Sequence, residues 1–180
     1  MKIGLLKIGT IDDLILNHLK ENITKIFAGI ECEVIPKIMP IPESAFNPAR
    51  GQYHSSIILA SIRKFTEDMH YNRVLGIVNV DLYVPHLNFV FGEAEFPGKC
   101  ALISLFRLKP EFYGEQPNDT LFLERALKEA VHELGHTFGL RHCGNPSCVM
   151  FFSNSIIDTD MKGASFCDEC AKKLRIEKFE

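Results

Sequence analysis

The chain has 180 residues, of which 46% are hydrophobic and 24% charged, with a formal net charge of −3. This composition is ordinary for a globular protein, and the small negative charge argues against nucleic acid or an anionic membrane surface as the main partner. No stretch approaches the roughly 20 uninterrupted apolar residues of a membrane span, and the N-terminus lacks signal-peptide features. We therefore expect a single domain over residues 1–180, present as a monomer in the cytoplasm.

Strand and helix patterns alternate along the first part of the chain. The expected strands are 2–8, 32–39, 74–83, 88–91 and 101–106, and the expected helices are 12–27, 52–69 and 120–138. The alternation predicts parallel strands with crossover helices, whereas the short connections later in the chain predict one antiparallel strand at an edge. The predicted fold class is α/β (α+β), with a twisted mixed sheet of about five strands.

The last predicted helix carries histidines at offsets that suit a metal. Residues four apart on a helix differ by about 40° in direction and about 6 Å in height, so His132 and His136 can direct both imidazoles at one point. Gly139 can adopt a positive φ and end the helix, which would let His142 reach the same ion. Three nitrogen ligands leave a fourth position open for water, as in a catalytic zinc site.

Glu133 follows the first of these histidines directly. It lies about 100° round the helix from His132, too far to be the natural third ligand but well placed to hydrogen-bond a metal-bound water. A carboxylate in that place is a suitable general base for attack on a peptide carbonyl. The alternative is a helix whose histidines are exposed or capped, but Gly139 and His142 at these offsets favour the metal site.

Four of the six cysteines crowd the C-terminal fifth of the chain. They are Cys143, Cys148, Cys167 and Cys170. Four thiolates form a closed tetrahedral zinc site with no water, so the role of such a site would be structural. It would tie a small C-terminal lobe, residues 140–180, to the N-terminal lobe, residues 1–139. The alternatives are two disulfides or four free thiols, and the lack of a secretion signal argues against disulfides.

From His132 to Cys170 the chain reads H-E-L-G-H-T-F-G-L-R-H-C-x4-C-x-M-x16-C-x-x-C. This pattern resembles the signature of the archaemetzincins, a group within the metzincin zinc metallopeptidases. The resemblance implies a metzincin-like fold, a zinc-dependent peptidase that acts on peptides or unfolded protein segments, and two zinc ions per chain. The histidines would hold the catalytic ion, with Glu133 as base, and the cysteines the structural one. Met150 would be the Met-turn residue that packs beneath the metal.

The resemblance leaves one alternative of a different class. The chain would then be a non-catalytic or weakly active peptide-binding module that keeps the zinc-stabilised fold. An intact Glu133 favours the enzyme, because a binding module has no need of a base beside the metal.

In metzincins the substrate pairs with an antiparallel edge strand above the zinc, so the resemblance makes residues 88–94 the candidate strand. The residues proposed to line the substrate are Asn88, Phe89, Val90, Phe91 and Gly92. Backbone pairing would supply affinity without sequence preference. We further expect Glu93 and Glu95 to favour basic substrate residues.

Overall fold

A mixed five-stranded sheet forms the centre of the computed structural model, which describes residues 1–177. In spatial order its strands are β2 (Glu31–Met39), β1 (Lys2–Ile8), β5 (Arg73–Val78), β8 (Cys100–Ser104) and β7 (Gly92–Ala94). The neighbouring pairs are parallel except for β7, which runs antiparallel to β8 at the edge. The predicted mixed sheet with one antiparallel edge strand is thus confirmed.

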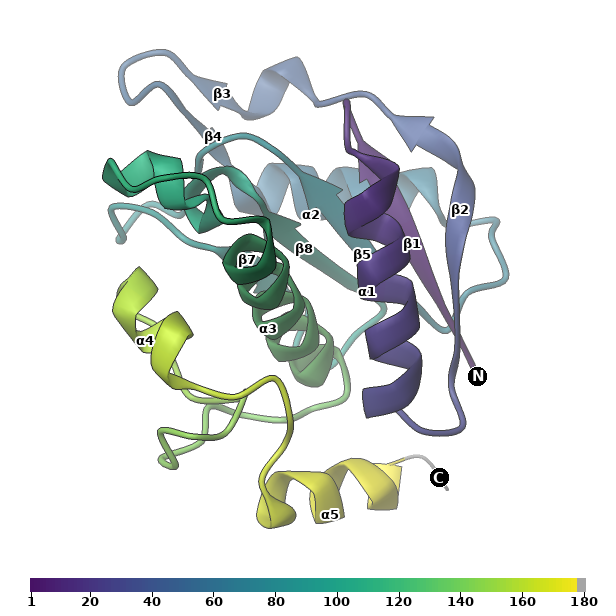
Figure 1. Cartoon of the computed structure of the whole chain (residues 1–180). Helices are drawn as coiled ribbons and strands as arrows, with labels where there is room; N and C mark the ends of the chain where they lie inside the picture. The colour runs from purple at the N-terminus through teal and green to yellow at the C-terminus, as the bar shows by residue number, and fades with distance from the viewer. Residues whose placement is uncertain (178–180) are drawn as a thin grey trace.

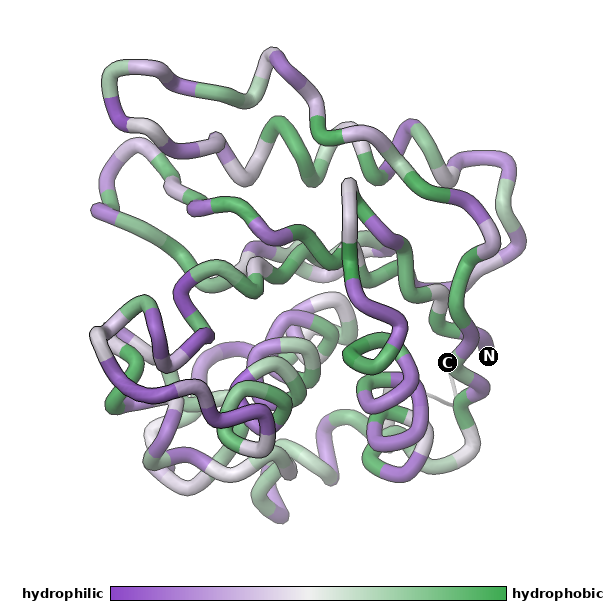
Figure 2. Tube along the Cα trace, turned by 45° about the horizontal axis from the view of Figure 1, so that its top comes forward, coloured by the Kyte–Doolittle hydropathy of each residue, from purple (hydrophilic) through white to green (hydrophobic). Residues whose placement is uncertain are grey.

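Helices cover both faces of this sheet (Figure 1). Helices α1 (Asp13–Ile26) and α3 (Asp119–Thr137) lie side by side on one face, and α2 (Ser55–Phe65) lies on the other. Each face has its own buried cluster, with Phe27 and Leu134 in one and Ile58 and Ile62 in the other. In Figure 2 the central strands are largely green, because a strand covered on both faces is apolar on both sides.

Both long helices of the first face have clear starting signals. The Asp12 carboxylate accepts a hydrogen bond from the Leu14 amide (2.9 Å), and the side-chain Oδ1 of Asn118 accepts one from the Leu121 amide (3.0 Å). These side chains satisfy backbone N–H groups that the first turn leaves without a partner. At its other end α3 stops before Gly139, whose φ is +82°. The helix that carries the histidines therefore has defined ends.

Two predicted elements are divided in the structure. The expected strand 74–83 was wrong in its second half: β5 ends at Val78, and β6 (Leu82–Tyr83) belongs to a separate sheet. The expected helix 52–69 begins three residues late, because β4 (Gln52–His54) pairs with β6 and with β3 (Phe46–Asn47). The backbone of Asp81 accepts from the Tyr53 amide (2.8 Å), so the chain turns here to make the small sheet.

The expected strand 88–91 was also wrong. Residues 88–91 form a loop, which makes an isolated bridge between Leu82 and Val90 and joins the main sheet only at its last residue, Phe91. The Arg50 guanidinium donates to the carbonyls of Leu87 (3.0 Å) and Asn88 (3.1 Å). These contacts hold the loop against the small sheet, and the edge strand of the main sheet begins only at Gly92.

The last part of the chain packs across the end of α3. It contains two short helices, α4 (Ile156–Met161), which lies to the left of α3 in Figure 1, and α5 (Asp168–Glu177), which lies below α3 and α1. The short 3-10 turns of the described chain are Glu43–Ala45, Phe106–Leu108 and Pro110–Tyr113. Among residues 1–177, none of the helices has the length and apolar character required to cross a membrane.

Candidate metal centres and active site

Three imidazoles converge at the end of α3. His132 and His136 project from its last two turns, and His142 follows the turn at Gly139. One nitrogen from each ring lies within 4.8 Å of the others, and the Nε2 atoms of His132 and His136 are 3.1 Å apart. Tetrahedral zinc with bonds of 2.0–2.1 Å separates its nitrogen ligands by about 3.3 Å. The spacing of these nitrogens therefore fits one zinc ion.

Backbone carbonyls set the tautomer of two of these rings. His132 Nδ1 lies 2.8 Å from the Val149 carbonyl, and His136 Nδ1 lies 2.7 Å from the Leu140 carbonyl. A carbonyl can only accept, so each Nδ1 carries the proton and each Nε2 presents a lone pair. Burial lowers the pKa of His132 well below its usual value and that of His136 to about 4. Both rings are thus held neutral, which is the form that binds a metal.

Glu133 is buried beside this cluster, directly across from the edge strand. Its carboxylate lies so close to β7 that a Cβ on Gly92 would come within 2.7 Å of Glu133 Cγ and Oε1. Only a residue without a side chain fits there. Burial raises the pKa of Glu133 well above its usual value, so the metal-free site holds a proton strongly. Gly92, expected as a residue of the substrate-binding strand, also makes room for the proposed base.

Met150 packs against the helix beneath the histidines. A Cβ at Gly135 would lie 2.5 Å from Met150 Sδ, so the sulfur sits directly on the α3 backbone. Met150 is fully buried, and its carbonyl accepts from the Cys143 amide (2.9 Å). The residue before it, Val149, supplies the carbonyl that orients His132. This turn therefore supports the cluster from below.

The four C-terminal cysteines also converge. Their sulfurs lie within 4.8 Å of one another, and Cys143 Sγ and Cys167 Sγ are 3.8 Å apart. Disulfide sulfurs are bonded at about 2.05 Å, whereas four thiolates at 2.3 Å from a zinc ion are about 3.8 Å apart. The Cys148 sulfur accepts from the Cys167 amide (3.3 Å), as expected for a thiolate ligand. The set fits a closed structural zinc site.

Comparison with known proteins identifies the family of this chain. The model of peptidase family M54 matches residues 8–176. The archaemetzincin of Methanocaldococcus jannaschii is 51% identical over 175 residues, which cover 97% of this chain and 93% of that protein. The chain belongs to peptidase family M54, the archaemetzincins. It is accordingly a zinc metallopeptidase, a hydrolase that acts on peptide bonds.

Solved archaemetzincins share the fold. The structure from Methanopyrus kandleri has a TM-score of 0.89 and 37% identity, covering 100% of this chain and 96% of that one. A structure from Archaeoglobus fulgidus, complexed with malonate, has a TM-score of 0.80 and 39% identity, covering 96% of this chain and 99% of that one. A zinc-dependent peptidase from Methanocorpusculum labreanum has a TM-score of 0.87 and 29% identity, covering 96% of this chain and 99% of that one.

In this member of M54 the edge strand presents backbone groups to the cleft. The Phe91 carbonyl accepts from the Ser104 amide (2.8 Å), and the Glu95 amide donates to the Cys100 carbonyl (3.0 Å). In an antiparallel pair, residues whose N–H and C=O groups bond the neighbouring strand alternate with residues whose groups point away from it. Gly92 and Ala94 therefore direct their N–H and C=O groups away from β8. A peptide strand added at this edge would meet those groups.

Glu93 and Glu95 point to the opposite face of the sheet from the histidines. Glu93 accepts hydrogen bonds from Ser55 and from Ser56 (2.7 Å), and Glu95 accepts from Arg63 (2.6 Å). The expectation that they favour basic substrate residues was therefore wrong. Alternation along the strand places both carboxylates against α2 rather than in the cleft.

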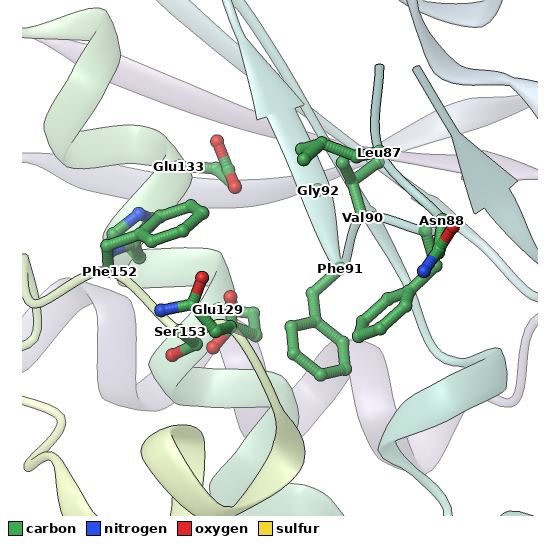
Figure 3. Close-up of a pocket in the computed structure, with 12 residues that line it drawn as sticks. Leu87, Asn88, Val90, Phe91, Gly92, Glu129, Glu133, Phe152 and Ser153 are labelled. Atoms are coloured by element: carbon green, nitrogen blue, oxygen red, sulfur yellow. The ribbon is translucent and has the colours of Figure 1, made fainter. Parts of the chain in front are cut away.

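A pocket next to Glu133 contains residues that sequence reasoning missed. Figure 3 shows Glu129, Phe152 and Ser153 on one side of it and Phe91 on the other. Glu129 lies one helical turn before Glu133, so the same four-residue spacing that revealed the histidines points to it. Lys162, the ion-pair partner of Glu129, lies 33 positions further along the sequence, so no short-range pattern relates the two residues.

Proposed function

We propose that His132, His136 and His142 hold the catalytic zinc of this peptidase and that Glu133 is its general base. One observation carries the proposal: three imidazole nitrogens converge, and a buried carboxylate lies beside them. Two of these rings are fixed and neutral before any metal binds. Such a site favours a catalytic ion, because three protein ligands leave one position for water.

The chemistry divides between the metal and the chain. Zinc, when bound, lowers the pKa of water and polarises the peptide carbonyl. Glu133 takes the proton of the attacking water and later gives it to the leaving amine. Burial supports this role, since the raised pKa makes Glu133 a stronger base than a carboxylate in water. The outward backbone groups of Gly92 and Ala94 bind the extended substrate and orient it.

We further propose a second, structural zinc on Cys143, Cys148, Cys167 and Cys170, which makes two per chain. Free thiols at this spacing require a reducing compartment, which supports a cytoplasmic location. The site lies where the C-terminal segment returns to the turn that bears His142. Residues 1–177 would then act as one unit whose two lobes share the cleft.

We propose cleavage within peptide chains rather than removal of N-terminal residues. On the side of the histidines away from Glu129, a second hollow is lined by Ala94, Phe96 and Arg141. Arg141 is exposed there, with its guanidinium 5.4 Å from the Phe96 ring centre. A free substrate amine would meet this positive charge instead of the carboxylate that an aminopeptidase needs.

The alternative is a peptide-binding module with little or no catalysis. The packing of Glu133 argues against a binding module, because the missing side chain at Gly92 leaves the space that the Glu133 carboxylate occupies. A carboxylate buried without an ion pair is costly, and a pure binder gains nothing from keeping it.

The test compares wild type with Glu133→Gln. We expect about two zinc ions per chain in both by metal analysis, and a rate of peptide cleavage about 10²- to 10⁴-fold lower in the variant. Glu124→Gln, an exposed position on the same helix, is the control and should match wild type. Equal cleavage by Glu133→Gln would contradict the assignment of the base. Wild type that binds zinc and peptide without cleaving would favour the binding module.

A further inference from the structure

The pocket beside Glu133 is suited to one substrate side chain. It encloses about 190 Å³, and about half of its lining is apolar, with Leu87, Val90 and Phe91 on one side and Phe152 on the other. Phe152 also packs on the His142 ring, with ring centres 4.8 Å apart. The pocket therefore adjoins both the metal cluster and the base, where the residue next to the cleaved bond would lie.

A carboxylate stands at the inner end of this pocket, but its charge is cancelled. Lys162 Nζ lies 3.0 Å from Glu129 Oε1, and the side-chain exposures of the two residues are 0% and 3%. The Thr159 hydroxyl donates to the same carboxylate oxygen at 3.1 Å. Both charges are thus withdrawn from water and directed at each other. The inner end of the pocket carries a polar group and no net charge.

The two partners come from separate parts of the fold. Glu129 is on α3, one turn before Glu133, while Lys162 directly follows α4. The position of Lys162 is set by its own amide, which donates to the Asp158 carbonyl (3.1 Å), and by the Gly163 amide, which donates to the Ser147 carbonyl (3.0 Å). The C-terminal segment therefore delivers a cation to a pocket that would otherwise be acidic.

We propose that Lys162 is a specificity-determining residue, which neutralises Glu129 and so makes this pocket select an uncharged substrate side chain beside the cleaved bond. The proposal rests on the proposed function of the site. A charged side chain entering the pocket would lose its hydration and find no net opposite charge, which is costly. An apolar side chain gains from the walls.

A polar but uncharged tip also fits. Ser153 lines the pocket, and its buried hydroxyl has no hydrogen-bond partner among residues 1–177. Buried hydroxyls are nearly always satisfied, so this one is available to a group that enters the pocket. It offers one hydrogen bond and adds no charge, which leaves the selection against charged side chains unchanged.

The experiment measures kcat/KM for matched peptides that carry Leu, Lys or Asp at each position flanking the cleaved bond. Wild type should cleave the Leu peptide at least tenfold faster than the other two. Lys162→Met, which leaves Glu129 alone, should shift the preference at least tenfold toward Lys. Glu129→Gln, which leaves Lys162 alone, should shift it toward Asp. The double variant has no charge in the pocket and should again prefer Leu.

Two further measurements keep the proposal decidable. The affinity of the same peptides for the zinc-free chain, by fluorescence anisotropy, should follow the same order and needs no turnover. Lys162→Arg keeps the charge and should keep the wild-type preference. Thermal unfolding shows whether each single variant folds, and where one does not, the preference of the other single variant decides.

The outcomes separate the two proposals. Wild-type cleavage that is equal for Leu, Lys and Asp, or a wild-type preference that is kept in folded Lys162→Met or folded Glu129→Gln, would overturn the role of Lys162 while leaving the peptidase intact. Absence of cleavage in wild type would overturn the proposed function. The peptide affinities from anisotropy would still test whether Lys162 sets the preference of the pocket.

Discussion

Glu133 occupies its place because the strand across from it has no side chain. A Cβ at Gly92 would come within 2.7 Å of the Glu133 carboxylate and within 2.5 Å of the Leu102 carbonyl. The backbone carbonyl cannot yield as a flexible side chain can, so an added methyl group must displace either the strand or the base. Gly92 thus couples the edge strand to the proposed catalytic carboxylate at the scale of a single atom.

Gly92→Ala should therefore lower kcat by about 100-fold, since a shift of about 1 Å in a catalytic group has that order of effect. Zinc content should stay as in wild type, because the three atoms nearest the added methyl belong to Leu102 and Glu133 and not to a histidine. Gly144→Ala, where nothing lies within 4 Å of the added methyl, is the matched control. Unchanged kcat in Gly92→Ala, measured on a single peptide with KM determined separately, would refute the coupling.

At the scale of elements, α3 carries His132, Glu133 and His136 on its last two turns, and His142 follows just beyond its end. Its start is set by Asn118, whose side chain accepts from the Leu121 amide, and its end by the positive φ of Gly139. The N-terminal cap is about four turns from the metal cluster. Stability of the helix and chemistry of the site are therefore separable by mutation.

Asn118→Ala should lower the free energy of unfolding by about 1 kcal/mol, the usual loss for removing such a cap. Cleavage and zinc content should not change at a temperature where the variant is folded. Asn118→Asp keeps an acceptor at this position and should restore the stability. Denaturant unfolding gives the free energies, and a loss of activity in folded Asn118→Ala would mean that the cap and the site are coupled.

At the scale of the whole molecule, folding forces titratable groups out of water at the cleft. His132 and His136 have lowered pKa values because they are buried, whereas in the unfolded chain they titrate near 6.5. Below pH 6.5 the unfolded chain takes up protons that the folded, metal-free chain excludes. Stability must then fall as the pH falls from about 6.5 to about 4, the folded pKa of His136.

The measurement is chemical unfolding of zinc-free protein from pH 7 to pH 4. It is best made in Glu133→Gln, because the raised pKa of Glu133 gives an opposite slope above about 4.5. Adding His136→Gln should reduce the slope of the unfolding free energy against pH. The reduction should correspond to about one proton per molecule. A stability that is flat or rises over this range would show that the histidines are not excluded from protonation.

Much of the site was predictable because its signals are local. His132, Glu133 and His136 lie on one helix, where periodicity relates sequence to direction. The turn at Gly139 and the paired cysteines extend this short-range pattern. The alternating strands and helices likewise predicted the mixed sheet, including its antiparallel edge. Predictions were wrong at 79–83 and 88–91, where apolar residues suggested strands of the main sheet. Hydrogen bonds from Tyr53 and Arg50 instead hold this part of the chain to the small sheet.

The sequence by itself determined which chemistry this protein carries: the three imidazoles, the carboxylate beside them and the four thiolates all follow from spacing along short segments. Only the tertiary structure decided what the cleft looks like to a substrate. It turned Glu93 and Glu95 away from the metal, placed Gly92 against Glu133 and brought Lys162 to Glu129. The reason is physical: helix and strand periodicity governs the direction of near neighbours, whereas contacts between distant segments depend on how whole elements pack.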